Sequence, residues 1–149
     1  MDNCHEEWVP VCPDAIPSQK YSICASNSDA DGLVIYLIGS EYEVKIEFGF
    51  IQAMQMLDEG TNLNDSPNHF VGDSVQQIRK QLFPNTIYEV HNSFFSRYIK
   101  NCMGSELYDA LKLRQFNIIT QNFVISIICR WEPVITVCCI KTRTEDGLL

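Results

Sequence analysis

The stretch Arg114–Cys139, RQFNIITQNFVISIICRWEPVITVCC, constrains the fold of this chain more than any other feature. It consists largely of Ile, Val, Phe, Thr and Cys, which suit the pleated, half-buried surface of a strand better than a helix. Gln121–Asn122 predicts a turn after a first strand. Trp131–Glu132–Pro133 predicts a break after a second strand, since proline lacks the N–H that a strand ladder needs. The stretch therefore predicts three consecutive strands.

Short connections join these three strands, and short connections favour antiparallel neighbours. We therefore expect Gln115–Gln121 to pair with Phe123–Arg130, and the latter to pair with Val134–Cys139.

The first half of the chain also predicts strands. Lys20–Ala25 predicts one, and Leu33–Ile38 is a continuous apolar run, typical of a strand covered on both faces. Glu41–Phe50 alternates, which is the pattern of a strand with one wet face. Ile51–Leu57 fits either a helix or a continued strand, and Thr86–Val90 predicts a weak strand.

In Glu41–Phe50, Val44, Ile46 and Phe48 share the predicted inner face, and Glu43, Lys45 and Glu47 the outer one.

Two helices are predicted between the strands. Asp73 is a suitable N-cap for a short helix that Pro84 would end. Asn92 is a suitable N-cap for a longer helix that Gly104 would end. The longer helix carries Arg97 and Lys100 on its polar side, which we interpret as a solvated face. Its predicted apolar stripe consists of Phe94, Phe95, Tyr98, Ile99 and Cys102.

These elements predict one domain over residues 1–149, with an irregular segment at 1–19 and a frayed tail at 141–149. The predicted fold class is α+β: a mostly antiparallel sheet of about six to eight strands, with two or three helices packed on it.

The whole chain has a net charge of −8, and its acidic residues are concentrated in the first half. Residues 1–66 hold 12 acids and 2 bases, whereas residues 67–149 hold 7 acids and 9 bases. Such a field repels nucleic acid and anionic membranes and attracts basic partners. It is also the field of an ordinary solubilising surface. We take the acids as candidate partner-binding residues: Asp29, Asp31, Glu41, Glu43, Glu47, Asp58 and Glu59.

The chain has seven cysteines, and an odd number argues against a fully paired disulfide framework. The start, MDNCHEEW, lacks the basic and apolar regions of a signal peptide, and no apolar run is long enough to span a bilayer. We therefore expect a cytoplasmic protein with reduced thiols that needs no disulfide.

No motif in the sequence predicts catalysis, a cofactor or a metal. Cys4, His5 and Cys12 lack the paired spacing of a zinc site. His91 could reach a strand cysteine as a nucleophilic pair, but a histidine packed at a helix entry is the more common arrangement. We accordingly expect no enzyme activity, no cofactor and no metal.

Two segments resemble a known class of protein. VKIEFGFIQAMQMLDEG (Val44–Gly60) and QFNIITQNFVISIICRWEPVI (Gln115–Ile135) resemble parts of small bacterial immunity proteins of polymorphic or contact-dependent growth inhibition toxins. The resemblance implies a cytoplasmic protein that binds one cognate toxin domain and blocks it. It carries over no specific binding residue.

Two other classes of function remain open. One is a small enzyme or ligand-binding domain with a pocket between sheet and helices. The other is an assembly subunit that pairs through a sheet edge.

Overall fold

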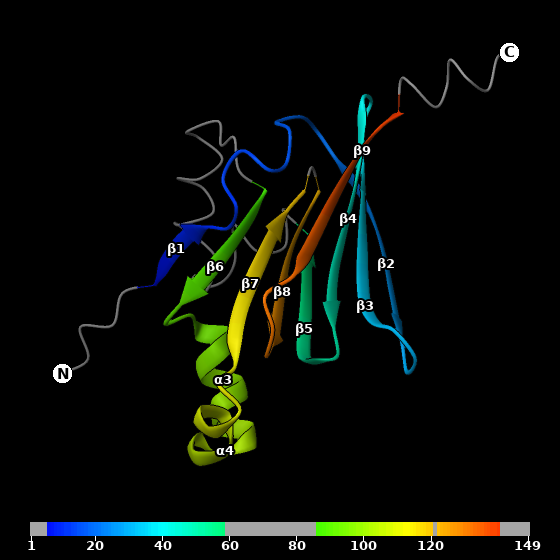
Figure 1. The fold of residues 1–149 in the computed structure, drawn as a ribbon. Helices are drawn as coiled ribbons and strands as arrows, with labels where there is room; N and C mark the ends of the chain where they lie inside the picture. The colour runs from blue at the N-terminus through cyan, green and yellow to red at the C-terminus, as the bar shows by residue number, and fades with distance from the viewer. Residues whose placement is uncertain (1–5, 59–85, 121, 141–149) are drawn as a thin grey trace, which may run out of the picture.

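The computed structural model describes residues 6–58, 86–120 and 122–140, which form nine strands and two helices (Figure 1). The predicted helix at Asp73 and the tail from residue 141 lie outside the described residues. The strands are β1 (Glu7–Pro10), β2 (Ser22–Ser28), β3 (Gly32–Ile38), β4 (Tyr42–Gly49), β5 (Ile51–Asp58), β6 (Ile87–His91), β7 (Arg114–Ile119), β8 (Phe123–Cys129) and β9 (Val134–Cys139), and the helices are α3 (Phe94–Met103) and α4 (Ser105–Ala110).

The strands form two antiparallel sheets rather than one. The first has the order β1-β6-β7-β8-β5, and the second has the order β2-β3-β4-β9. The helices α3 and α4 follow β6 and lie at one end of the five-stranded sheet (Figure 1). The mostly antiparallel α+β class expected from the sequence is therefore confirmed, whereas the nine strands exceed the six to eight expected, and their division into two sheets was not expected.

A shared hydrophobic core holds the two sheets together. Phe48 of the four-stranded sheet meets Phe116 of the five-stranded sheet, with ring centroids 6.2 Å apart. Burial of each large apolar side chain in such a core contributes about 1.5–3 kcal/mol. Fully buried members from both sheets form one cluster: Leu33, Ile35, Leu37, Val44, Ile46, Ile118, Ile125 and Ile127.

The alternation predicted for β4 is confirmed, because Val44, Ile46 and Phe48 are buried and the residues between them are half-exposed. The expectation that Leu33–Ile38 is covered on both faces was wrong. Ile38 is 45% exposed, because β3 lies in a sheet whose second face is not covered by another layer of described residues. The ambiguous segment Ile51–Leu57 is a strand, β5.

The expected pairing at the end of the chain is half right. β7 and β8 pair as predicted, from Arg114–Cys129 to Ile119–Val124. The predicted pairing of β8 with β9 is wrong, because β7 and β5 occupy the two edges of β8. β9 pairs instead with β4 of the other sheet. The Trp131–Glu132–Pro133 break therefore carries the chain from one sheet to the other.

A second passage between the sheets runs from β4 to β5 through Gly49 and Phe50. Gly32 lies against it so closely that a Cβ there would be 2.2 Å from the Gly49 carbonyl carbon. Gly32 and Gly49 both have positive φ, at 73° and 74°. Only glycine combines that backbone with so close an approach.

Helix α3 differs from expectation at its start and on its apolar side. Ser93, not Asn92, is the N-cap, and its side chain accepts a hydrogen bond from the Ser96 N–H at 2.9 Å. Asn92 has a φ of 60°, a conformation that asparagine tolerates, so it makes the bend before the cap. Of the predicted stripe only Phe95 is buried, and Tyr98 is 57% exposed. Gly104 ends the helix as predicted.

Candidate functional site

The acidic residues proposed as one binding surface lie in several places. Asp29 and Asp31 are exposed in the β2–β3 turn, and Asp58 ends β5 in the other sheet. Glu41 precedes β4, which carries Glu43 and Glu47. Glu59 lies outside the described residues. The structure therefore groups only Glu41, Glu43 and Glu47.

Glu43 and Glu47 belong to what we call the outer sheet face, the side of the four-stranded sheet that points away from the core. The register places Glu43 beside Cys138 and Glu47 beside Val134. Lys45 lies between them and forms an ion pair with Glu47 at 3.5 Å. The other outward side chains of β3 and β9 on this face are Val34, Tyr36, Ile38 and Thr136.

The outer sheet face is thus only weakly acidic and has an apolar component. Ile38 and Val134 are 45% and 59% exposed. Exposed apolar side chains with charged neighbours are the composition of many protein interfaces. Sequence alternation correctly predicted that Glu43 and Glu47 point outward. Their apolar neighbours follow from the pairing of β4 with β3 and β9.

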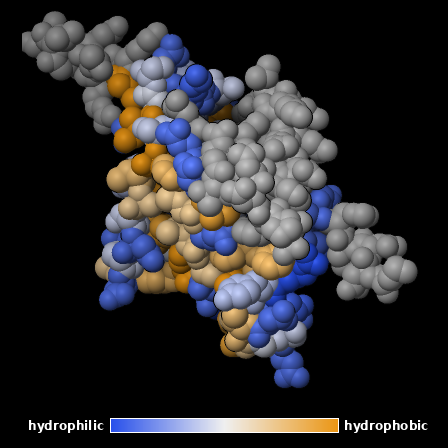
Figure 2. Space-filling view, turned by 180° about the vertical axis from the view of Figure 1, so that it is seen from behind, coloured by the Kyte–Doolittle hydropathy of each residue, from blue (hydrophilic) through white to orange (hydrophobic). Residues whose placement is uncertain are grey.

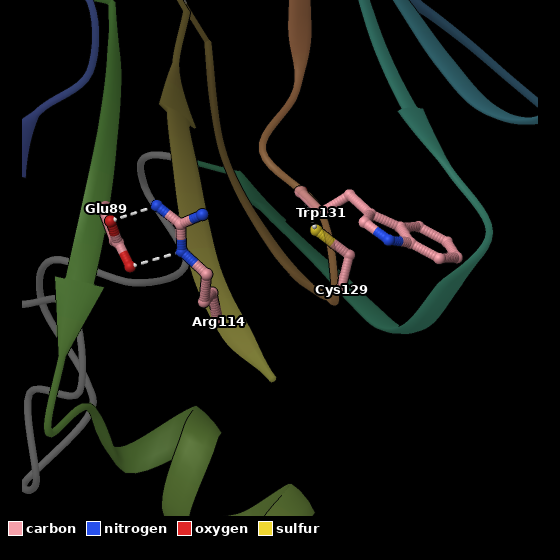
Figure 3. Close-up of polar contacts among 4 residues, drawn as sticks. All are labelled: Glu89, Arg114, Cys129 and Trp131. Carbon is pink, nitrogen blue, oxygen red and sulfur yellow. Dashed lines mark hydrogen bonds and ion pairs between the residues drawn. The ribbon is translucent and has the colours of Figure 1, made fainter. Parts of the chain in front are cut away.

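At one end of this face, Trp131 and Phe50 are 53% and 54% exposed, where the chain passes between the sheets. The guanidinium of Arg130 lies 5.3 Å from the Trp131 ring centroid. In Figure 3 the Trp131 ring extends toward the turn between β4 and β5. Figure 2, which shows the molecule from behind relative to Figure 1, shows apolar side chains gathered on that side as well. Exposed Trp and Arg are frequent among residues that dominate binding energy at interfaces.

A cleft of about 350 Å³ lies between the β6–β7 strand ends and the two helices, and we call it the α3–β7 cleft. Its charged and aromatic walls are Glu89, His91, Arg97, Lys100, Tyr108 and Arg114. Every residue that lines it belongs to the described part of the chain.

An ion pair between adjacent strands forms one wall of this cleft (Figure 3). Arg114 donates from Nε and Nη2 to the two carboxylate oxygens of Glu89, at 2.9 and 2.8 Å. The hydrogen bonds from Arg114 lower the pKa of Glu89 below its usual value. On the helical wall, Lys100 pairs with Asp109 at 3.1 Å and lies over the Tyr108 ring.

Glu6 lies near this region and is partly buried. Burial raises the pKa of its carboxyl group to about 7, against the lowering effects of the Trp8 hydrogen bond and the charge of Arg97. The Trp8 Nε1–H donates to Glu6 at 2.6 Å. Trp8 also packs on Tyr88, with ring centroids 5.7 Å apart.

A buried chain of polar side chains begins at the cleft, which Gln115 lines. The Ser93 hydroxyl donates to Gln115 Oε1, and Gln115 Nε2 donates to Asn117 Oδ1 at 2.8 Å. All three side chains are almost fully buried. Hydrogen bonding of this kind orients the residues at the base of the cleft.

The cysteines offer no activated thiol in the strand core. Cys129 donates from Sγ to the Trp131 carbonyl oxygen at 3.3 Å, and burial raises the pKa of its thiol to about 11. A thiol that stays protonated is a poor nucleophile. Cys12, Cys24, Cys102, Cys129 and Cys138 are free thiols, and within the described ranges no three His, Cys, Asp or Glu side chains gather as metal ligands. Of the zinc residues considered, Cys4 and His5 lie outside those ranges.

Sequence reasoning missed the α3–β7 cleft. Arg97 and Lys100 were interpreted as a solvated helix face, and Arg114 only as a strand residue. A signal was present, since residues 67–149 hold more bases than acids. The sequence could not show that some of these bases line one cleft, because the cleft forms only where α3 and α4 lie beside the strand ends.

No family model matches this chain, and no match was found among curated proteins or among solved structures. Among the described residues, neither helix has the length and apolar character needed to cross a membrane.

Proposed function

We propose that this chain is a non-catalytic immunity protein of the cytoplasm, which binds and neutralises a cognate toxin domain through the outer sheet face. The observation that carries the proposal is the composition of that face. Glu43 and Glu47 lie beside the exposed apolar side chains of Ile38 and Val134, with Trp131 at one end. Interfaces combine apolar contacts, which supply affinity, with charged neighbours, which supply specificity.

Charge supports a basic partner. The chain has a net charge of −8, and its acids are concentrated in residues 1–66. Toxin domains that act on nucleic acids need basic surfaces to hold phosphates. An acidic inhibitor complements such a surface, which speeds association and excludes other partners. The resemblance of Val44–Gly60 and Gln115–Ile135 to immunity proteins favours the same function.

The first experiment asks whether the partner exists. The tagged protein is co-expressed with the product of the neighbouring gene and purified, and the complex is measured by size-exclusion chromatography with light scattering. A stable complex that protects cells from that product supports the proposal. A product with no toxicity and no binding contradicts it.

The second experiment locates the interface. We expect the triple variant Glu41→Gln, Glu43→Gln and Glu47→Gln to fold normally but to associate about tenfold more slowly at low salt. The matched control is the triple variant Asp29→Asn, Asp31→Asn and Asp58→Asn, which removes the same charge elsewhere. Equal slowing by both variants would mean that only net charge matters.

A third variant separates affinity from encounter rate. Ile38→Ser combined with Val134→Ser removes exposed apolar surface from the same face. We expect a faster dissociation rate with little change in association, because packed apolar contacts act mainly after encounter. An unchanged dissociation rate would exclude this face as the apolar centre.

The α3–β7 cleft favours the alternative function, a ligand-binding domain. Its volume of about 350 Å³ lies within the range of small-molecule sites. The two functions use different surfaces of the molecule, so loss of toxin binding and loss of ligand binding can be measured separately.

A further inference from the structure

The α3–β7 cleft has an excess of positive charge in an otherwise acidic protein. Arg97, Lys100 and Arg114 line it, against the single carboxylate of Glu89. Two of these cations already have carboxylate partners, since Arg114 pairs with Glu89 and Lys100 with Asp109.

Arg97 is the third cation, and its charge also acts on the nearby carboxyl group of Glu6, whose pKa it lowers. Its Nε donates to the Ser93 carbonyl oxygen at 3.3 Å, which orients the guanidinium at the first turn of α3. Within the described ranges no carboxylate oxygen lies within 4.0 Å of its nitrogens. An oriented guanidinium with unused N–H groups is a strong donor to a carboxylate or a phosphate.

We propose that the α3–β7 cleft binds a small molecule through an oxyanion, a carboxylate or a phosphate group, that Arg97 holds. Lys100 and Arg114 line the same cleft, each paired with its own carboxylate partner. The ring of Tyr108 forms part of the wall and offers apolar contact to the remainder of the ligand. This inference goes beyond toxin binding, because it concerns residues on the other sheet.

Hydrogen bonds hold the side chains of the supporting wall in place. Arg114 is held by two hydrogen bonds to Glu89, and Gln115 is held in the buried chain from Ser93 to Asn117. A preformed site loses less conformational entropy when a ligand binds.

The test uses inorganic phosphate and succinate as separate probes of the full-length protein. Each is titrated at constant ionic strength, kept with sodium chloride, and binding is followed by amide chemical shifts and by calorimetry. We expect saturable binding of at least one probe, with shifts centred on residues 89–100 and 108–115. The probe that binds more tightly identifies the oxyanion.

Variants decide whether Arg97 is responsible. Arg97→Gln should weaken binding about tenfold, as expected for loss of a charged hydrogen bond, whereas Arg97→Lys should retain part of it. Lys20→Gln, an exposed control that removes the same charge away from the cleft, should bind like the original protein. Absence of saturable binding by both probes, or equal binding by Arg97→Gln, overturns the proposal. The triple variant of Glu41, Glu43 and Glu47 should bind the probe normally, which keeps this test independent of the proposed function.

Discussion

Arg114 donates two hydrogen bonds to Glu89 across the β6–β7 pair, and this ion pair forms one wall of the α3–β7 cleft. The Glu89 side chain is 20% exposed and that of Arg114 is 34% exposed, so solvent screens the pair only in part. The arrangement fixes the strand ends from which α3 departs and to which α4 returns.

We predict that Glu89→Gln lowers the free energy of unfolding by about 1 kcal/mol at pH 7. Because Arg114 lowers the pKa of Glu89, its contribution is present above the ordinary pKa and is lost as pH falls through the folded value. Urea unfolding of variant and original protein should therefore converge as pH falls below the ordinary value of 4.5 and through the lowered folded pKa of Glu89. Glu7→Gln, an exposed glutamate on β1, is the control. A difference that persists undiminished in acid would show that the charge of Glu89 is irrelevant.

We predict that Gly32→Ala destabilises the protein much more than Gly104→Ala. Both glycines have positive φ, at 73° and 94°, so both substitutions strain the backbone. Only at Gly32 would the new Cβ meet backbone, 2.2 Å from Gly49, whereas nothing lies within 4 Å of it at Gly104. The losses in unfolding free energy should differ by about 2 kcal/mol or more. Equal losses would mean that the close approach of Gly32 and Gly49 relaxes without cost.

We predict that Glu6 makes stability fall as pH rises from about 4.5 to about 7. Its folded pKa of about 7 lies above the ordinary value of 4.5, so the folded state holds the proton that the unfolded state releases. Allowing for partial solvent exposure, the loss should be about 1 kcal/mol. Glu6→Gln should remove this slope in urea unfolding series, while Glu7→Gln should keep it. A slope that survives Glu6→Gln would assign it to another group.

We predict that Cys129 resists alkylation in the folded protein at pH 8. It is buried, and its thiol has a pKa of about 11, so little thiolate forms. Cys24 is exposed on β2 and serves as the internal control. Peptide mass spectrometry after iodoacetamide treatment should find Cys24 modified and Cys129 modified only in denaturant. Comparable labelling of both without denaturant would contradict the packing described for β8.

The sequence alone determined the character of most strands. Period-two alternation identified the inner face of β4, and the turn signal predicted from Gln121–Asn122 identified the β7–β8 hairpin. These features depend on side-chain pattern and turn chemistry within about ten residues, and local sequence encodes them directly. The outward direction of Glu43 and Glu47 followed from the same alternation.

Only the tertiary structure decided which strand lies beside which. Local signals could not show that β5 and β7 occupy both edges of β8, and this is why β9 pairs with β4 instead. The α3–β7 cleft was hidden for a related reason. Arg97 and Arg114 come from different elements, and the polar side of a helix reads the same in sequence whether it faces water or a cleft. Strand order and cleft formation depend on how two hydrophobic sheet faces share one core and on where the two helices lie at its end, which is a property of the whole chain.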